Sequence, residues 1–187
     1  MTDPYFFGYG SLVNRATHAF PRATRATAEG WGRVWKKTRL REVAFLTAIA
    51  RPGMQIDGLV AAVPGHDWAA LDAREWAYSR GPAGLVTHDL KGDIDIQIYR
   101  TRPEHDADGS QDHPILLSYL DTVVQGYLEE FGPLGAERFF ATTDGWDSPV
   151  LDDRAAPRYP RAQRLSQAET DVVDGALRIL GCNVITS

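Results

Sequence analysis

The sequence has a single cysteine, Cys182, among its 187 residues. One cysteine excludes an internal disulfide and a metal site built from several cysteines, and it fits a reducing compartment. We therefore expect a cytoplasmic protein in which Cys182 is structural, because no activating base stands near it in the sequence. The N-terminal stretch also lacks the basic and long apolar regions of a signal peptide, and no apolar run has the length of a membrane span.

Positive charge is scarce as well. Twenty Lys and Arg residues stand against 25 Asp and Glu, which gives a net charge of −5. A nucleic acid or an anionic membrane needs a positive surface, so we expect neither as a partner. The histidines also lack the spacing of a metal site, and we expect no metal and no cofactor. They are His18, His66, His88, His105 and His113.

The composition that remains is that of an ordinary globular protein, 43% hydrophobic and 24% charged. The length predicts one domain over residues 1–187, as a monomer or homodimer, with a C-terminal helical extension from about residue 133. That extension contains a Pro- and Arg-rich segment, 152–164, and a final helix over 166–180.

Several segments have the pattern of strands, with few helices between them. We expect strands at 27–38, 43–50 and 55–63, and a hairpin formed by 83–89 and 94–99. Such a run favours antiparallel pairing, so the predicted fold class is α+β: a small, mostly antiparallel β-barrel of about six strands with surrounding helices. A short helix over 13–20 is expected beside it.

A long helix is predicted from His113, with Asp112 as its N-cap, after a polar connection over 102–112. Gly132 and Pro133 should break it. Its aromatic side chains, Tyr119 among them, fall on an apolar face, and residues in such a position are more often core than site.

The stretch from Tyr5 to Leu12, YFFGYGSL, reads as a strand that runs into a glycine-flanked turn. Gly8 and Gly10 allow another molecule to approach the main chain closely, and bare backbone N–H groups there are a candidate cradle for a carboxylate. The alternative is an ordinary strand-to-helix turn. Ser11 lacks the Gly-x-Ser-x-Gly pattern of a nucleophile, so it is a candidate donor of the loop.

A helix predicted over 67–78 places Glu75 on an apolar face with Leu71 and Tyr78. A buried carboxylate needs a cation partner, a raised pKa or a function. Two interpretations stay open: a catalytic acid, or a core-edge glutamate paired with a cation such as Arg80. The remaining charged residues of the helix are expected to be solvated; they are Asp67, Asp72 and Arg74.

Three motifs in order resemble those of the γ-glutamylcyclotransferase-like superfamily. They are the Gly-Tyr-Gly-Ser-Leu loop at 8–12, the strand EGWGRVW at 29–35, and the segment LDxxExxYxR at 71–80, which in that family carries the acidic catalytic residue. The stretch SYLDTVVQGYLEEFG at 118–132 loosely resembles the helix that follows the barrel in the glutathione-specific, ChaC-type branch.

The resemblance implies an enzyme that cyclises a γ-glutamyl amide, such as glutathione or a γ-glutamyl amino acid or amine, to 5-oxoproline. In that scheme Glu75 is the general base and then the general acid. The loop and Tyr78 bind the small-molecule substrate; the loop residues concerned are Tyr9, Gly10, Ser11, Leu12 and Val13. The alternatives are a non-catalytic binding module on the same fold, and removal of a γ-glutamyl group from a larger metabolite.

Overall fold

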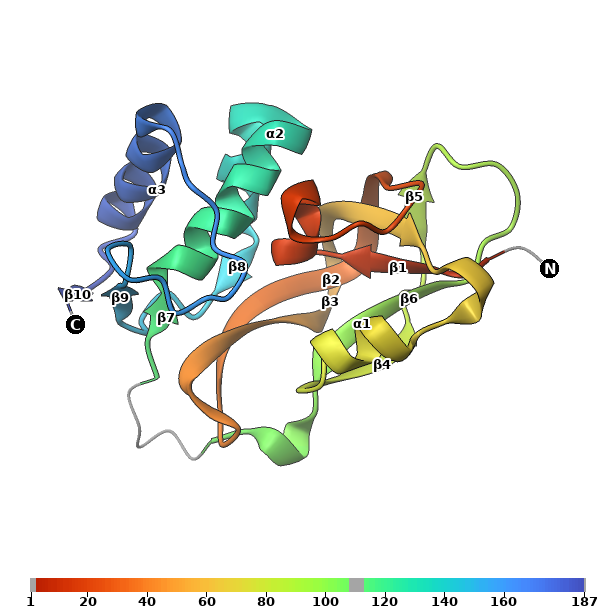
Figure 1. Cartoon of the computed structure of the whole chain (residues 1–187), viewed down its shortest axis with the longest axis horizontal. Coiled ribbons are helices and arrows are strands. Elements are labelled where there is room, and N and C mark those ends of the chain that lie inside the picture. The colour runs from red at the N-terminus through yellow and green to blue at the C-terminus, as the bar shows by residue number, and fades with distance from the viewer. Residues whose placement is uncertain (1–2, 108–112, 187) are drawn as a thin grey trace.

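A computed structural model describes residues 3–107 and 113–186, which form an α+β fold (Figure 1). The larger sheet has the strand order β4-β6-β1-β3-β2-β5, with β8 beside β2. Its strands are β1 (Tyr5–Gly8), β2 (Thr24–Thr38), β3 (Arg41–Ala62), β4 (Tyr78–Pro82), β5 (Val86–His88), β6 (Ile96–Thr101) and β8 (Thr143–Asp144). The smaller sheet is β10-β9-β7, formed by Val184–Thr186, Val150–Asp152 and Ile115–Leu116. The described α-helices are α1 (Ala69–Arg74), α2 (Leu117–Ala141) and α3 (Gln167–Ile179).

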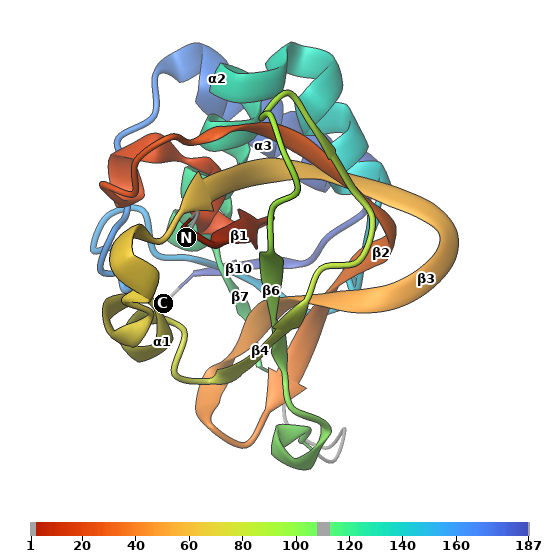
Figure 2. The same cartoon turned by 90° about the vertical axis from the view of Figure 1, so that its right-hand side faces the viewer.

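Strands β2 and β3 are long and strongly curved, as Figure 2 shows. Pairing passes from Glu29 opposite Gln55 to Trp31 opposite Ala50, so the ladder contains a bulge. Gly30 and Gly53 have φ angles of +77° and +83° there, which L side chains rarely adopt. The prediction of two strands at 43–50 and 55–63 is therefore wrong: the chain bends at the bulge without leaving the sheet.

Most pairings in the larger sheet are antiparallel, as predicted, although β1 pairs with β6 and β2 with β8 in parallel. The expected closed barrel is not found. Among the described residues β4 and β5 are the two ends of the strand order and do not pair with each other. The expected hairpin of 83–89 with 94–99 is also wrong, because β5 pairs with β2 while β6 lies between β1 and β4.

Helix α1 is shorter than predicted. It ends at Arg74, and Glu75, with φ −96° and ψ 32°, is its C-cap. Tyr78 does not continue the helix, because it starts β4 and pairs with Thr101 of β6. The apolar periodicity over 67–78 is thus shared between one short helix and the strand that follows it.

Helix α2 begins at Leu117, four residues after the predicted start at His113, because residues 115–116 form strand β7. Gly132 leaves helical geometry with a φ of +67°, which confirms the predicted break. The proposed cap Asp112 and part of the 102–112 connection lie outside the described residues. The helix expected over 13–20 is not formed; instead Ser11–Val13 and Arg15–Thr17 form short 3₁₀ turns.

The final helix is confirmed as α3, where Ser166 accepts from the Glu169 N–H and the Glu169 side chain accepts from the Ser166 N–H. Helices α2 and α3 lie side by side on one side of the curved sheet (Figure 1). No helix within the described ranges is long and apolar enough to cross a membrane.

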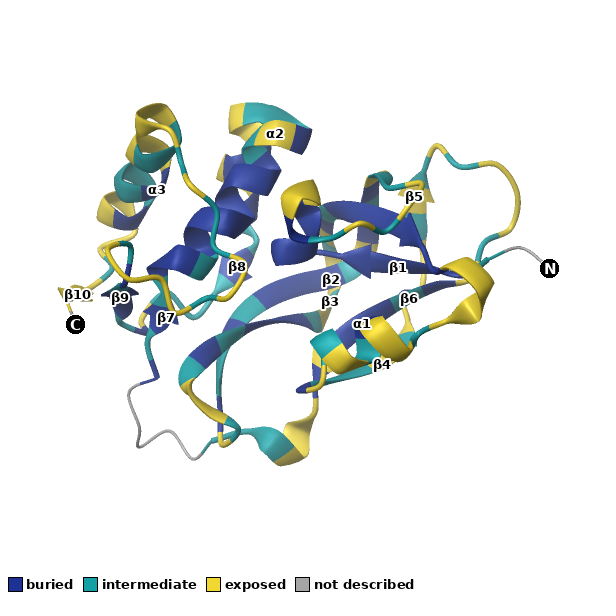
Figure 3. Cartoon of the chain, in the orientation of Figure 1, coloured by how far each residue is buried: buried dark blue, intermediate teal, exposed yellow. Residues whose placement is uncertain are grey.

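The main core lies between the curved sheet and α2, where Figure 3 shows the buried residues. Arg33, from the EGWGRVW strand, is completely buried in this core. Its guanidinium donates to the Asp57 carbonyl and the Tyr127 hydroxyl, each at 2.6 Å, and to the Thr142 hydroxyl at 2.7 Å. These bonds compensate the buried charge, so this arginine joins the sheet to α2.

Candidate active site

A cavity of about 320 Å³ opens beside the N-terminal end of α2. Segments far apart in the sequence form its wall. Its polar and aromatic lining residues include Ser11, Arg41, Arg74, Glu75, Tyr78, Tyr119, Tyr159 and Arg161. A smaller cavity of about 30 Å³ adjoins it, lined by the predicted loop together with Glu75, Tyr78 and Tyr119. The structure therefore brings most of the predicted site residues together.

Glu75 lines both cavities, and its side chain is only 16% exposed. Burial raises the pKa of the Glu75 carboxyl above its usual value, and the positive charges of Arg74 and Arg161 only partly oppose this. Its position at the C-cap of α1 directs it between the helix and the glycine loop. A carboxylate with a raised pKa in a cavity is a candidate proton-transfer group.

The ion-pair partner of Glu75 is Arg74, whose Nε lies 3.3 Å from Glu75 Oε1. The alternative pairing with Arg80 is wrong, because Arg80 pairs with Asp72 at 3.3 Å. Arg74 was expected to be solvated, yet its side chain is only 8% exposed. Asp67 is exposed, as expected, and the Asp72 side chain is 45% exposed.

Arg74 is held by more than Glu75. It donates to the Thr17 carbonyl at 2.9 Å, the Thr17 hydroxyl at 3.1 Å and the Ser11 hydroxyl at 3.2 Å. Its guanidinium therefore joins the catalytic candidate to the glycine loop. Sequence reasoning missed Arg74 because its partners lie 57 and 63 positions away in the chain.

The loop from Tyr9 to Leu12 lines the smaller cavity. A Cβ on Gly10 would lie 2.6 Å from the Tyr119 hydroxyl oxygen, so only glycine permits this close approach. Val13 differs from the other predicted loop residues. It is fully buried in the core, lines neither cavity, and its N–H donates to the Gly10 carbonyl at 2.9 Å.

Two of the predicted tyrosines are fixed by backbone acceptors. The Tyr9 hydroxyl donates to the Tyr99 carbonyl at 2.6 Å, and the Tyr78 hydroxyl donates to the Leu46 carbonyl at 2.9 Å. Burial raises the pKa of both hydroxyls. Each phenol therefore stays neutral at ordinary pH. The Tyr78 oxygen can still accept from a donor in the cavity, whereas the Tyr9 oxygen already faces the Ala48 backbone and the Thr47 side chain.

Tyr119 and Tyr159 are site-lining residues that the sequence prediction missed. Tyr119 was interpreted as core, but it lines both cavities, and its ring meets that of Tyr159 edge to face at 5.0 Å. Tyr159 and Arg161 come from the Pro- and Arg-rich segment, to which no role was assigned. Its dense Arg and Pro content was the only signal in the sequence.

Other candidate chemistry is not supported at this cavity. Within residues 3–107 and 113–186, no group of three or more His, Cys, Asp or Glu side chains is arranged to hold a metal ion. Cys182 lines neither cavity, and burial raises the pKa of its thiol, which disfavours the reactive thiolate.

No protein-family profile matches the sequence, and no curated protein is significantly similar to it. Solved structures do share its fold. A γ-glutamyl cyclotransferase superposes with a TM-score of 0.58 at 16% identity, over 92% of this chain and 99% of that one. The uncharacterised protein LOC79017 from Homo sapiens gives 0.57 at 17% identity, over 93% and 99%.

YkqA from Bacillus subtilis superposes with a TM-score of 0.60 at 17% identity over 78% of this chain, which spans only 57% of the YkqA structure. Identities this low concern the fold and leave the substrate open. The resemblance drawn from the three motifs is confirmed at that level: the chain shares its fold with a solved γ-glutamyl cyclotransferase.

Proposed function

We propose that this protein is a γ-glutamyl cyclotransferase, which converts a γ-glutamyl amide into 5-oxoproline and a free amine. The observation that carries the proposal is the largely buried Glu75 carboxyl, which lines the small cavity together with the glycine loop. The shared fold is compatible with this chemistry, but one fold supports many functions. The residues of the site must therefore account for the reaction.

The reaction is an internal acyl transfer. The substrate's α-amino nitrogen attacks its own γ-carbonyl carbon, a new C–N bond closes the five-membered ring, and the original amide C–N bond breaks. One proton passes from the attacking to the departing nitrogen, so no water, oxidant or covalent enzyme intermediate is needed. Holding the reacting atoms together contributes on the order of 7–11 kcal/mol in well-oriented internal reactions.

Glu75 supplies the proton path in this scheme. As a carboxylate it accepts a proton from the attacking nitrogen, and as a carboxylic acid it donates that proton to the departing amine. Burial supports the role because it raises the pKa of Glu75 toward the operating pH. Arg74, at 3.3 Å, orients the carboxylate, and its positive charge favours the ionised form.

The loop binds the γ-glutamyl end of the substrate. Backbone N–H groups of Gly10, Ser11 and Leu12 hold the α-carboxylate or the γ-carbonyl oxygen. The Tyr78 oxygen accepts a hydrogen bond from the α-amino group, and Tyr9 forms part of the cavity wall. Val13 has no part in this, because its N–H is bonded to Gly10. The proposal requires neither a metal nor a cofactor, and we place the reaction in the cytoplasm.

The test is to incubate the purified protein with glutathione, γ-glutamylalanine and γ-glutamylethylamide and to measure 5-oxoproline by mass spectrometry. We expect release from at least one of them, and its loss in Glu75→Gln. Binding of these compounds without any 5-oxoproline would favour a non-catalytic binding module. Free glutamate as the product would instead indicate hydrolysis and would contradict the proposed cyclisation.

A further inference from the structure

Residues 153–165 connect β9 to α3, and we call this segment the cavity coil. It passes along α2 and contributes Tyr159, Pro160 and Arg161 to the wall of the larger cavity (Figure 1). A connection without regular structure holds such residues in place only if its own backbone is fixed. The contacts of the coil with α2 supply that constraint.

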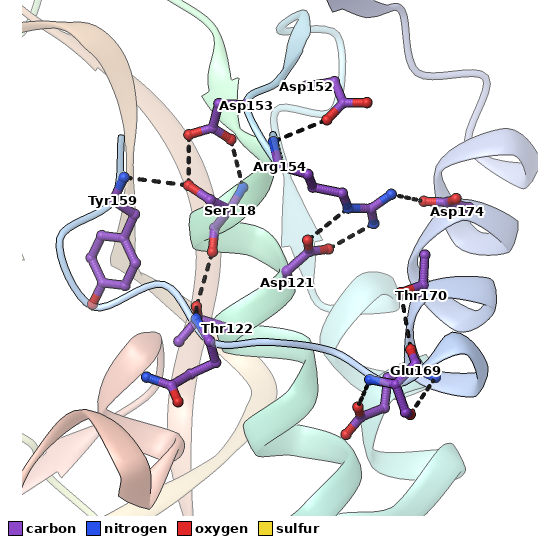
Figure 4. A network of polar contacts seen from close by, with 12 residues as sticks. Ser118, Asp121, Thr122, Asp152, Asp153, Arg154, Tyr159, Glu169, Thr170 and Asp174 are labelled. Carbon is purple, nitrogen blue, oxygen red and sulfur yellow. Dashed lines mark hydrogen bonds and ion pairs between the residues drawn. The ribbon is translucent and has the colours of Figure 1, made fainter. Parts of the chain in front are cut away.

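Asp153 fixes the first part of the cavity coil, as Figure 4 shows. Its carboxylate is almost fully buried and accepts from the Ser118 N–H at 2.8 Å, the Ser118 hydroxyl at 2.6 Å and the Arg158 N–H at 2.8 Å. The Tyr159 N–H then donates to the Ser118 oxygen at 3.3 Å. Tyr159 is thus bonded directly to Ser118 in the first turn of α2, and Arg158 is bonded to it through Asp153.

Further contacts follow along α2. The Gln163 N–H donates to the Thr122 hydroxyl at 3.1 Å, and the Gln125 amide donates to the Arg164 carbonyl at 3.3 Å. Ser118, Thr122 and Gln125 are spaced four and three residues apart and share one helix face. That polar face on a largely buried helix therefore serves to bind the coil.

Arg154 anchors the beginning of the coil to both helices. It donates to the two Asp121 oxygens at 2.7 and 2.8 Å and to Asp174 of α3 at 2.8 Å (Figure 4). Bidentate arginine–carboxylate pairs are directional as well as strong. The coil is therefore fixed on both sides of Tyr159 and Arg161.

The charges of the larger cavity are unbalanced. Arg41, Arg74 and Arg161 line it, whereas Glu75 is its acidic lining residue. Arg74 is occupied by Glu75, Ser11 and Thr17. Arg41 and Arg161 are exposed, and neither has a carboxylate ion-pair partner among the described residues; Arg41 lies over the Trp76 ring at 5.1 Å.

Both arginines line the larger cavity and neither lines the smaller one, where the loop residues Tyr9, Gly10 and Leu12 lie; Ser11 lines both cavities. In the proposed reaction the loop holds the γ-glutamyl end, so the departing amine extends into the larger cavity. We propose that Arg161, presented by the cavity coil, together with Arg41 selects γ-glutamyl substrates whose departing amine carries a carboxylate. This inference rests on the proposed function and assigns Ser118 and Asp153 as positioning residues.

The test compares two substrates that differ at the departing amine. γ-Glutamylalanine releases an amine with a carboxylate, and γ-glutamylethylamide releases one without it. Relative to its effect on γ-glutamylethylamide, Arg161→Gln should lower kcat/KM for γ-glutamylalanine about tenfold or more, mainly through KM. Because the charge of Arg161 also lowers the pKa of Glu75, a change in kcat common to both substrates is expected and is not part of this preference. Arg158→Gln is the matched control, because Arg158 is an exposed arginine of the same coil that lines neither cavity.

A positioning role for Asp153 predicts that Asp153→Asn shifts the preference between the two substrates in the same direction as Arg161→Gln. A purely structural Asp153 would lower both activities equally. Equal effects of Arg161→Gln on the two substrates, or none on either, would overturn the inference while 5-oxoproline release still supported the proposed function.

Calorimetric binding in the Glu75→Gln background separates the two failures, because it needs no turnover. There, tighter binding of γ-glutamylalanine than of γ-glutamylethylamide, abolished by Arg161→Gln, supports the subsite even if no 5-oxoproline is formed by the parent protein. Equal affinities for the two compounds, or binding of neither, would overturn it.

Discussion

Replacing Glu75 with glutamine separates a catalytic acid from a structural ion pair. Glutamine keeps the size of the side chain and removes the charge and the exchangeable carboxyl proton. If Glu75 moves the proton between the two nitrogens, turnover should fall by roughly 10²–10⁴-fold. Substrate binding should persist, because the loop from Gly10 to Leu12 is unchanged.

The expected effect on stability follows from the surroundings of Glu75. Burial outweighs the attraction of Arg74 and raises the pKa, so the charged form is disfavoured in the folded protein, and its removal should leave stability unchanged or increased. Arg74 would keep its bonds to Thr17 and Ser11. A truly structural buried pair would instead cost about 3–5 kcal/mol when broken, or about 6–20 °C in Tm for a domain of this size.

The assay measures 5-oxoproline release, ligand affinity and Tm on one preparation of each variant. Glu137→Gln is the matched control, since Glu137 is exposed on α2 and lines neither cavity. A folded Glu75→Gln protein that turns over at the parent rate would refute the catalytic assignment. A Tm lower by about 6–20 °C, with activity lost only in proportion to unfolding, would also refute the proton-transfer role of Glu75.

Three further predictions concern the loop, pH and inhibitors. Gly10→Ala should weaken substrate binding about tenfold, because the added Cβ would lie 2.6 Å from the Tyr119 hydroxyl oxygen and would push that side chain aside. Gly175→Ala is the control, because a Cβ there meets nothing within 4 Å and binding should not change. Calorimetry measures both affinities. Folding raises the pKa of Glu75, so the contribution of this group to the free energy of unfolding is fully present below the unfolded pKa and is lost as pH rises through the folded pKa. Denaturation measured from pH 4 upward should therefore show the parent protein losing stability relative to Glu75→Gln. The same pH dependence in both proteins would contradict this. Turnover should survive EDTA and thiol-blocking reagents, since the mechanism uses neither a metal nor Cys182, and EDTA-sensitive activity restored by zinc would overturn that mechanism.

The sequence predicted which segments are strands better than it predicted how they pair. Alternating apolar residues show that one face of a segment is buried, but they carry no information on the neighbouring strand. Residues 83–89 and 94–99 were placed in one hairpin, yet the strands found there, β5 and β6, pair with different strands of the sheet. The helix prediction over 67–78 failed for a related reason, because the burial of Tyr78 comes from β4 and the cavity wall, not from a helix face.

The site was predictable only where a single position contradicts its local pattern. Glu75 stood out as a charge on an apolar face, and Gly10 as a glycine at the end of an aromatic strand, so the sequence singled out both as candidates. Arg74 fits its local pattern as a flanking charge, and only the fold brings it to Ser11 and Thr17.

The cavity coil shows what kind of signal was overlooked. Ser118 and Thr122 are polar residues on α2, and both are buried. Buried hydroxyls need hydrogen-bond partners, and α2 supplies only part of them, since the Thr122 hydroxyl donates to the Ser118 carbonyl at 2.9 Å. The Ser118 hydroxyl and the acceptor side of Thr122 are bonded by the segment that packs along the helix. Asp153 and Gln163 provide those partners, and the residues between them, Tyr159 to Arg161, are thereby carried to the cavity. Hydrogen bonds of α2 thus position the part of the larger cavity wall that Tyr159 and Arg161 form. This is why no motif near Glu75 could have revealed it.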